Sequence, residues 1–137
     1  MLTKQISLFI ENKKGRLGEV TSILKRANVN IKAFSLLDTN NFGVFRFIAD
    51  NINNAKKALQ KENFTTGITF VLCALIKEKQ GGLNKILRLI DESKINIEYM
   101  YPFVKSKGDN SIIVFRFDDN EKALKIFKKN NIKIVKE

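Results

Sequence analysis

The sequence contains no histidine, a single cysteine and no long apolar run, and each of these absences removes a class of function. Without histidine, the chain lacks the side chain that most often acts as a general base or binds a metal ion. The lone thiol, Cys73, permits neither an intrachain disulfide nor a multi-thiolate zinc site, and its apolar neighbours favour a buried, inert role. No apolar stretch approaches the roughly 20 residues of a membrane-spanning helix. We therefore expect a non-enzymatic protein without cofactor or metal, which is soluble and cytoplasmic and carries no targeting segment.

Basic side chains outnumber acidic ones by 25 to 14 among the 137 residues, which gives a formal net charge of +11. Such an excess is typical of proteins that bind nucleic acids or anionic membranes. The charge is nevertheless spread along the chain, because residues 1–68 hold 11 basic and 5 acidic groups and residues 69–137 hold 14 and 9. Lysine, asparagine and isoleucine are all unusually abundant, which indicates a bias of composition. The charge pattern thus argues against nucleic acid as the partner.

Comparison of the sequence with itself reveals two related halves. Phe9–Leu17 (FIENKKGRL) aligns with Leu75–Leu83 (LIKEKQGGL). Further along, Phe45–Phe47 recurs as Phe115–Phe117, at a slightly larger spacing, and the extra residues fall in a polar turn. The sequence therefore predicts two homologous units, residues 1–69 and residues 70–137.

Each unit shows the same order of hydrophobic patterns. Short β-prone stretches predict strands, apolar side chains at three- and four-residue spacing predict helices, and Thr39-Asn40-Asn41 predicts a hairpin turn. The order is βαββαβ, so we predict an α+β fold of two ferredoxin-like units, each with an antiparallel sheet and both helices on one face, packed together. The expected segments are strand 3–10, helix 16–27, strands 30–38 and 42–50, helix 51–62 and strand 65–69, followed by strand 70–77, helix 82–93, strands 96–105 and 111–118, helix 120–129 and a strand near 132–135.

The predicted sheets are apolar on both faces, although two helices can cover only one of them. On the first strand, for example, both Leu8 and its neighbour Phe9 are apolar. A second cover is then needed, and we expect either a homodimer or a tight sheet contact between the units. Alternation also predicts that Tyr99 and Tyr101 share the helix-facing side of their strand with Ile97.

The segment Ile6–Val20 resembles the opening of ACT domains, in which the first strand ends in an Asn/Asp-x-Pro-Gly-x-Leu loop before the first helix. The Val-Asn-Ile after the helix and the Phe-Gly-Val-Phe-Arg-Phe strand also fit, and Gln80–Leu83 repeats the loop in the second unit. Lys14 and Gln80 stand where the family has proline. The whole chain is similar to small stand-alone tandem ACT proteins, which are amino-acid-binding regulators.

The two loops suit a carboxylate on physical grounds as well. Glycine permits a positive φ and close approach of a ligand, and the first turn of a helix presents N–H groups without partners. Asn12 can accept from an ammonium group and donate to a carboxylate. Alternatively, the glycines only form the turns and the leucines only anchor the helices. The resemblance implies a small amino acid effector between this loop and the second strand of the neighbouring unit, bound by Asn12, Lys14, Gly15, Arg16, Leu17, Ser35, Gln80, Gly81, Gly82, Leu83 and Tyr99.

Two other functions share parts of this pattern. One is the regulatory small subunit of an amino-acid biosynthetic enzyme such as acetolactate synthase. The other is the RNA-recognition motif, which has the same βαββαβ order and whose first-strand hexamer is matched at five positions by Leu8–Lys13. Its third-strand octamer would fall on Asn40–Phe47, which lacks the opening Arg/Lys-Gly pair and has Val44 at a stacking position. RNA binding is therefore the weaker alternative.

Overall fold

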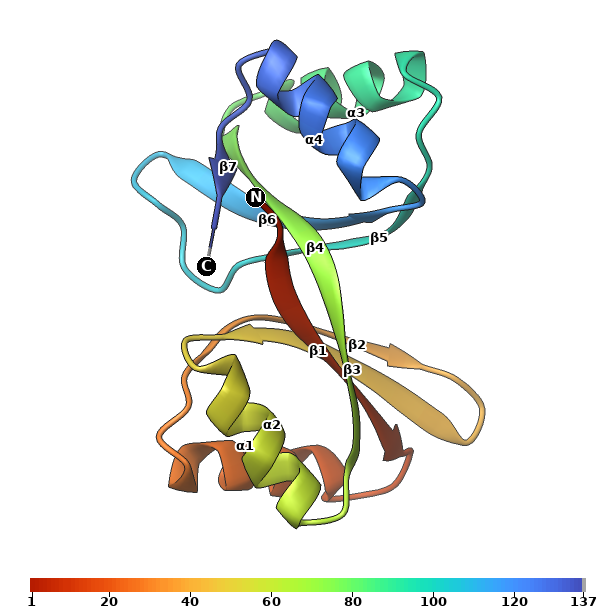
Figure 1. Ribbon diagram of the computed structural model, residues 1–137, viewed down its shortest axis with the longest axis vertical. Helices are drawn as coiled ribbons and strands as arrows, with labels where there is room; N and C mark the ends of the chain where they lie inside the picture. The colour runs from red at the N-terminus through yellow and green to blue at the C-terminus, as the bar shows by residue number, and fades with distance from the viewer. Residues whose placement is uncertain (137) are drawn as a thin grey trace. The chain divides into compact units, whose positions relative to one another are not determined.

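The computed structural model describes residues 1–136 and confirms the predicted α+β fold, in which the βαββαβ order occurs twice (Figure 1). The chain divides into a first unit, Lys4–Thr69, and a second unit formed by Phe70–Lys136 together with Met1–Thr3. Leu2 accordingly packs against the hydrophobic core of the second unit. The elements are β1 (Thr3–Glu11), α1 (Arg16–Arg26), β2 (Ile31–Asp38), β3 (Phe42–Ala49), α2 (Ile52–Lys61), β4 (Thr65–Lys77), α3 (Gly82–Glu92), β5 (Ile97–Pro102), β6 (Asn110–Phe117), α4 (Asn120–Lys129) and β7 (Ile134–Val135).

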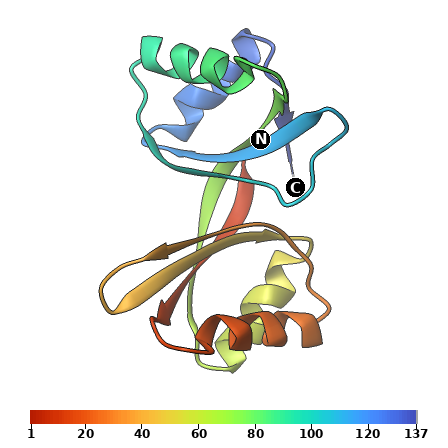
Figure 2. The ribbon, with the colours of Figure 1, turned by 180° about the vertical axis from the view of Figure 1, so that it is seen from behind.

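Both units have the same strand order. In the first it is β2-β3-β1-β4 and in the second it is β5-β6-β4-β7, so the continuous strand β4 serves each unit with a different part of its length. The pairs β1–β3, β2–β3, β4–β6, β4–β7 and β5–β6 are antiparallel. Within each unit the two helices lie on the same face of the sheet, as the view from behind also shows (Figure 2). This arrangement places the β1–α1 and β4–α3 turns at equivalent positions of the two units.

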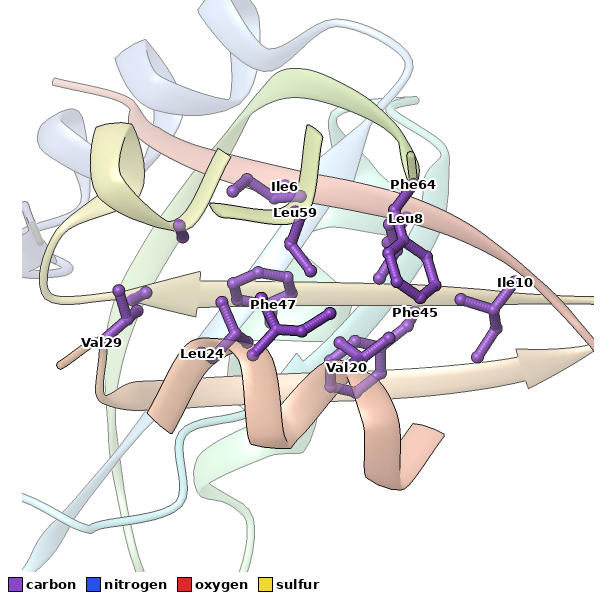
Figure 3. Packing of buried hydrophobic residues seen from close by; sticks show 13 residues of the cluster. Ile6, Leu8, Ile10, Val20, Leu24, Val29, Phe45, Phe47, Leu59 and Phe64 are labelled. Carbon is purple, nitrogen blue, oxygen red and sulfur yellow. The ribbon is translucent and has the colours of Figure 1, made fainter. Parts of the chain in front are cut away.

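The core of the first unit is formed by alternate residues of β1 and β3 that point towards the helices. In the register of the two strands, Ile6 lies opposite Phe47 and Leu8 lies opposite Phe45. All four side chains are buried. Figure 3 shows them packed against residues of the helices and the segments that follow them, among them Val20, Leu24, Val29, Leu59 and Phe64.

Aromatic packing dominates the core of the second unit. The ring centroids of Phe115 and Phe117 on β6 lie 5.3 Å apart, and Phe127 of α4 meets them edge-on at 6.1 and 5.9 Å respectively. Edge-to-face pairs of this kind contribute about 0.5–1.5 kcal/mol beyond the burial of their surface. Phe127 therefore fixes α4 to the sheet.

A β-bulge overturns one prediction about the second unit. Ile97 lies opposite Phe117 and packs into the core, whereas Tyr99 lies opposite Arg116 on the other face of the sheet. The register shifts between Ile97 and Tyr99, and such a shift turns the following side chains to the opposite face. The prediction that Tyr99 and Tyr101 share the helix-facing side with Ile97 is therefore wrong.

The first sheet does carry apolar side chains on its second face, as predicted. Phe9 pairs with Val44, which in turn pairs with Leu37, and this row points away from the helices. Phe9 and Leu37 remain 53% and 52% exposed. Among residues 1–136, no helix is long and apolar enough to cross a membrane.

The core packing predicts a difference between two leucines of the first unit. Replacing the fully buried Leu59 with alanine should lower the free energy of unfolding by about 2–5 kcal/mol, because a cavity is left among Ile6, Leu8 and Phe47. The matched change at the half-exposed Leu36 should alter it by less than about 0.5 kcal/mol. Urea unfolding followed by circular dichroism measures both, and equal losses would contradict the assigned core.

Candidate functional site

The β1–α1 and β4–α3 turns are each built around a glycine in the left-handed conformation. Gly15 has φ 84° and ψ −9° at the start of α1, and Gly81 has φ 83° and ψ −3° at the start of α3. A Cβ added at either position would meet no atom within 4 Å. The backbone conformation, and not crowding, therefore selects glycine at both turns.

The helices that follow these glycines begin without a side-chain cap, unlike the other two helices. Asn51 accepts a hydrogen bond from the N–H of Asn54 (3.1 Å) and so caps α2, and Asp119 accepts one from the N–H of Lys122 (3.0 Å) and caps α4. No side chain makes the equivalent bond at α1 or α3 within the described chain. Their first turns thus keep N–H donors and a positive dipole end available for an anion.

The first loop is tied to the β2–β3 hairpin by Asn12. Its Nδ2 donates to Oδ1 of Asp38 at 2.8 Å, and its backbone N–H donates to the carbonyl oxygen of Asn41 at 3.1 Å. The neighbouring Lys13 lies 3.5 Å from the carboxylate of Glu11. The loop is therefore held in place while the amide oxygen of Asn12 stays available as an acceptor.

Arg16 points back onto its own unit. Its guanidinium carbon lies 4.7 Å above the centre of the Phe64 ring, and Nη1 donates to Oε2 of Glu19 at 2.8 Å. Nη2 lies 4.0 Å from Oε1 of Glu11. Leu17, the next residue, is half-buried and packs against the core. The positive charge that the sequence places beside the first glycine is thus largely compensated by the unit's own carboxylates.

The second loop borders an open groove with a volume of about 830 Å³. Gln80, Gly81 and Gly82 line it, while one wall is formed by α3 and another by the α4–β7 turn (130–133). At Gly82 a Cβ would overlap the carbonyl oxygen of Lys77, so the backbone there accepts only glycine. Leu83 is 41% exposed and is not part of the walls, in contrast to its half-buried counterpart Leu17.

Of the three remaining predicted site residues, Lys14 is exposed in the first loop, and Ser35 and Tyr99 lie on strands and face away from the helices. Ser35 of β2 is paired with Arg46, and Tyr99 of β5 is paired with Arg116, the residue equivalent to Arg46 in the second repeat. Tyr99 also stacks on Tyr101, with 6.4 Å between the ring centroids. Neither Ser35 nor Tyr99 lines the groove beside the second loop.

A family model described as an ACT domain pair matches residues 1–137. The chain belongs to this ACT domain family. The resemblance seen in the sequence is thereby confirmed, and ACT domain pairs are typically regulatory modules that bind amino acids. No curated protein matches the chain.

Solved structures support the same assignment of this ACT domain pair. It is similar to protein BT0572 from Bacteroides thetaiotaomicron, with 32% identity over 98% of this chain and 92% of that chain and a TM-score of 0.92. The regulatory subunit of aspartate kinase from Thermus thermophilus, in its ligand-free form, has a TM-score of 0.60 and 12% identity over 92% and 91% of the two chains. The corresponding subunit from Thermus flavus has a TM-score of 0.60 and 15% identity over 92% and 90%. The two Thermus subunits share the fold with this chain.

Sequence reasoning missed the cationic side chains that surround the groove of the second unit. They come from the end of β4, the β4–α3 loop, one face of α3 and the segment after α4, which are distant in sequence. Lys85 and Arg88 are three residues apart and therefore share one face of the predicted helix, and this spacing could have indicated part of the cationic cluster. The groove walls include a single acidic residue, Glu92, and five cationic ones, Lys77, Lys79, Lys85, Arg88 and Lys133.

Within residues 1–136, no cluster of three or more His, Cys, Asp or Glu side chains could hold a metal ion.

Gly15 in the first loop and Gly18 in α1 should respond to alanine in opposite ways. Gly15→Ala should lower the free energy of unfolding by about 1–2 kcal/mol, because alanine must adopt the left-handed conformation. Gly18→Ala should raise it by about 0.5–1 kcal/mol, since Gly18 lies within α1 and a Cβ there meets no atom within 4 Å. Urea unfolding compares the two variants, and a change of the same sign in both would contradict the conformational explanation.

Proposed function

We propose that this ACT domain pair binds a small amino acid at its two glycine loops and signals the level of that amino acid to a protein partner, without catalysing a reaction. The observation that supports it is the matched geometry of the two loops. In both, a left-handed glycine precedes a helix that has no side-chain cap, whereas the other helix of each unit is capped. A carboxylate at the first turn would accept from the free N–H groups.

The side chains around the first loop also suit the α-ammonium group of an amino acid. The amide nitrogen of Asn12 is held by Asp38, so its oxygen is oriented to accept from an α-ammonium group. In the second repeat Glu78 occupies this position and accepts a hydrogen bond from Ser111. The family resemblance adds Ser35 and Tyr99 as contacts to the effector. We propose them together with Lys14, Gly15, Arg16, Leu17 and Gln80–Leu83 as the ligand residues.

The signal requires a partner that responds to the bound state. A homodimer is one candidate, because the apolar row of Phe9, Val44 and Leu37 is exposed on the face of the first sheet that its helices do not cover. A separate catalytic chain is the alternative, in which case this protein is a regulatory subunit and should co-purify with that enzyme. In either arrangement the effector acts by binding one state of the assembly more tightly than the other.

The proposal predicts a selective increase in thermal stability with one or a few amino acids. A ligand that binds only the folded state stabilises it by about 2.7 kcal/mol when present at a hundredfold excess over its dissociation constant. Differential scanning fluorimetry with each of the twenty amino acids measures the shift, and a single-stranded RNA oligomer is the control. No shift with any amino acid together with a clear shift with RNA would overturn the proposal.

The loop can then be tested with the amino acid that gives the largest shift. Gly15→Val should weaken its binding at the first loop, because the valine side chain occupies the approach to α1 and resists the positive φ. Gly18→Ala leaves the turn intact and serves as the control for changes within α1. Isothermal titration calorimetry measures affinity and stoichiometry. Unchanged binding in a folded Gly15→Val variant would exclude this site.

The proposed homodimer gives a further expectation. Phe9→Lys combined with Leu37→Lys should shift the protein to a monomer, because two charges would enter an apolar contact on the uncovered face of the first sheet. Sedimentation velocity gives the mass of each form, and Lys122→Gln is a surface control. A wild-type protein that sediments as a monomer at high concentration would refute the dimer.

A further inference from the structure

The two repeats carry opposite charges at equivalent positions around their glycine loops. When the two loops are aligned on Gly15 and Gly81, Glu11 aligns with Lys77 and Glu19 aligns with Lys85. Arg16, which both glutamates contact in the first unit, aligns with Gly82. Two carboxylates around one arginine have thus been replaced by two ammonium groups around a residue without a side chain.

In the first unit the arginine fills the space beside the loop. Its guanidinium lies over Phe64, at 4.7 Å from the ring centre, and meets Glu19 at 2.8 Å. Phe64 aligns with Ile132 of the second repeat, and Ile132 is one of the residues that line the groove. The side chain of Arg16 therefore occupies, in the first unit, the place where the second unit has its groove.

In the second unit this place is kept open and is surrounded by positive charge. A side chain at position 82 is excluded by the carbonyl oxygen of Lys77, so this position cannot supply a counterpart of the arginine. α3 has no acidic residue in its first turn, where α1 has Glu19. Among residues 1–136, none of the five cationic side chains of the groove has an ion pair or a hydrogen bond to another residue. Five cations without a partner around one concave surface create a positive potential that attracts anions.

We propose that this groove binds a small organic polyanion that carries phosphate or carboxylate groups, at one site per chain. Arg88 offers a planar pair of donors, and Lys77 and Lys85 supply further positive charges to the groove walls. Ile86 and Ile132 give the groove an apolar part that suits the carbon skeleton of such a ligand. The volume of about 830 Å³ accommodates a ligand larger than an inorganic ion. The site goes beyond the proposed amino-acid function, since Arg88, Lys85 and Ile132 lie outside the glycine loops.

Calorimetric titration of the full chain with citrate and with glycerol 3-phosphate tests the proposal and separates the two sources of negative charge. We expect at least one of them to bind with a stoichiometry of one per chain and with an affinity that falls as salt is added. Lys85→Gln combined with Arg88→Gln should weaken that binding by about tenfold or more, because two charged hydrogen-bond donors are lost. The matched control, Lys122→Gln with Lys125→Gln, removes the same charge from α4 outside the groove and should change affinity less than about twofold.

The remaining outcomes are equally decisive. Binding of neither probe at millimolar concentration, or equal weakening in both double variants, would overturn the proposal. A stoichiometry of two per chain would also overturn it, because the first unit fills the equivalent space with Arg16. The amino-acid screen distinguishes the two proposals: a double variant that loses the polyanion but keeps the thermal shift with an amino acid supports a role of Lys85 and Arg88 in polyanion binding alone.

Discussion

The left-handed glycine at the β1–α1 and β4–α3 turns is the constraint on which these two loops depend. A residue with a Cβ would lose about 1–2 kcal/mol in this conformation, so Gly15 and Gly81 are retained in both repeats. Because glycine then occupies the position that precedes the helix, no Ser, Thr, Asn or Asp side chain can cap it. Each unit thus contains one helix with an open start and one, α2 or α4, whose start is closed by Asn51 or Asp119.

Since Gly15 and Gly81 have nearly the same backbone conformation, the two loops differ chiefly in their side chains. In the first unit the charge of the arginine beside the loop is compensated, because Arg16 contacts Glu11, Glu19 and the Phe64 ring. The second unit has lost both the arginine and the carboxylates, and the close approach of the Lys77 carbonyl prevents any side chain from returning at position 82. The two copies of one fold therefore have one loop whose arginine is paired with carboxylates and one whose neighbouring cations have no such partners among residues 1–136.

The sequence predicts those features that depend on neighbouring residues. Helix-face spacing, strand alternation and the glycine turns gave the element order, and the alternation of Leu8 and Phe9 correctly indicated a sheet with apolar side chains on both faces. The bulge before Tyr99 escaped prediction because one extra residue inverts every later side chain of that strand without changing its composition. The contact of Arg16 with Phe64 escaped for another reason: the two residues lie far apart in sequence and meet only through the fold.

The net charge of +11 also shows that the sequence does not reveal which distant residues the fold brings together. Counted along the chain it is spread evenly, yet the fold brings Lys77, Lys85, Arg88 and Lys133 from separate segments to one groove. Like charges gathered at one groove repel one another, so an anion bound among them would stabilise this part of the second unit. The groove and the proposed amino-acid loop share Gln80–Gly82 and the start of α3. Two anionic groups that use the same helix dipole oppose each other, so the two ligands would be negatively coupled, each reducing the affinity for the other by the same factor.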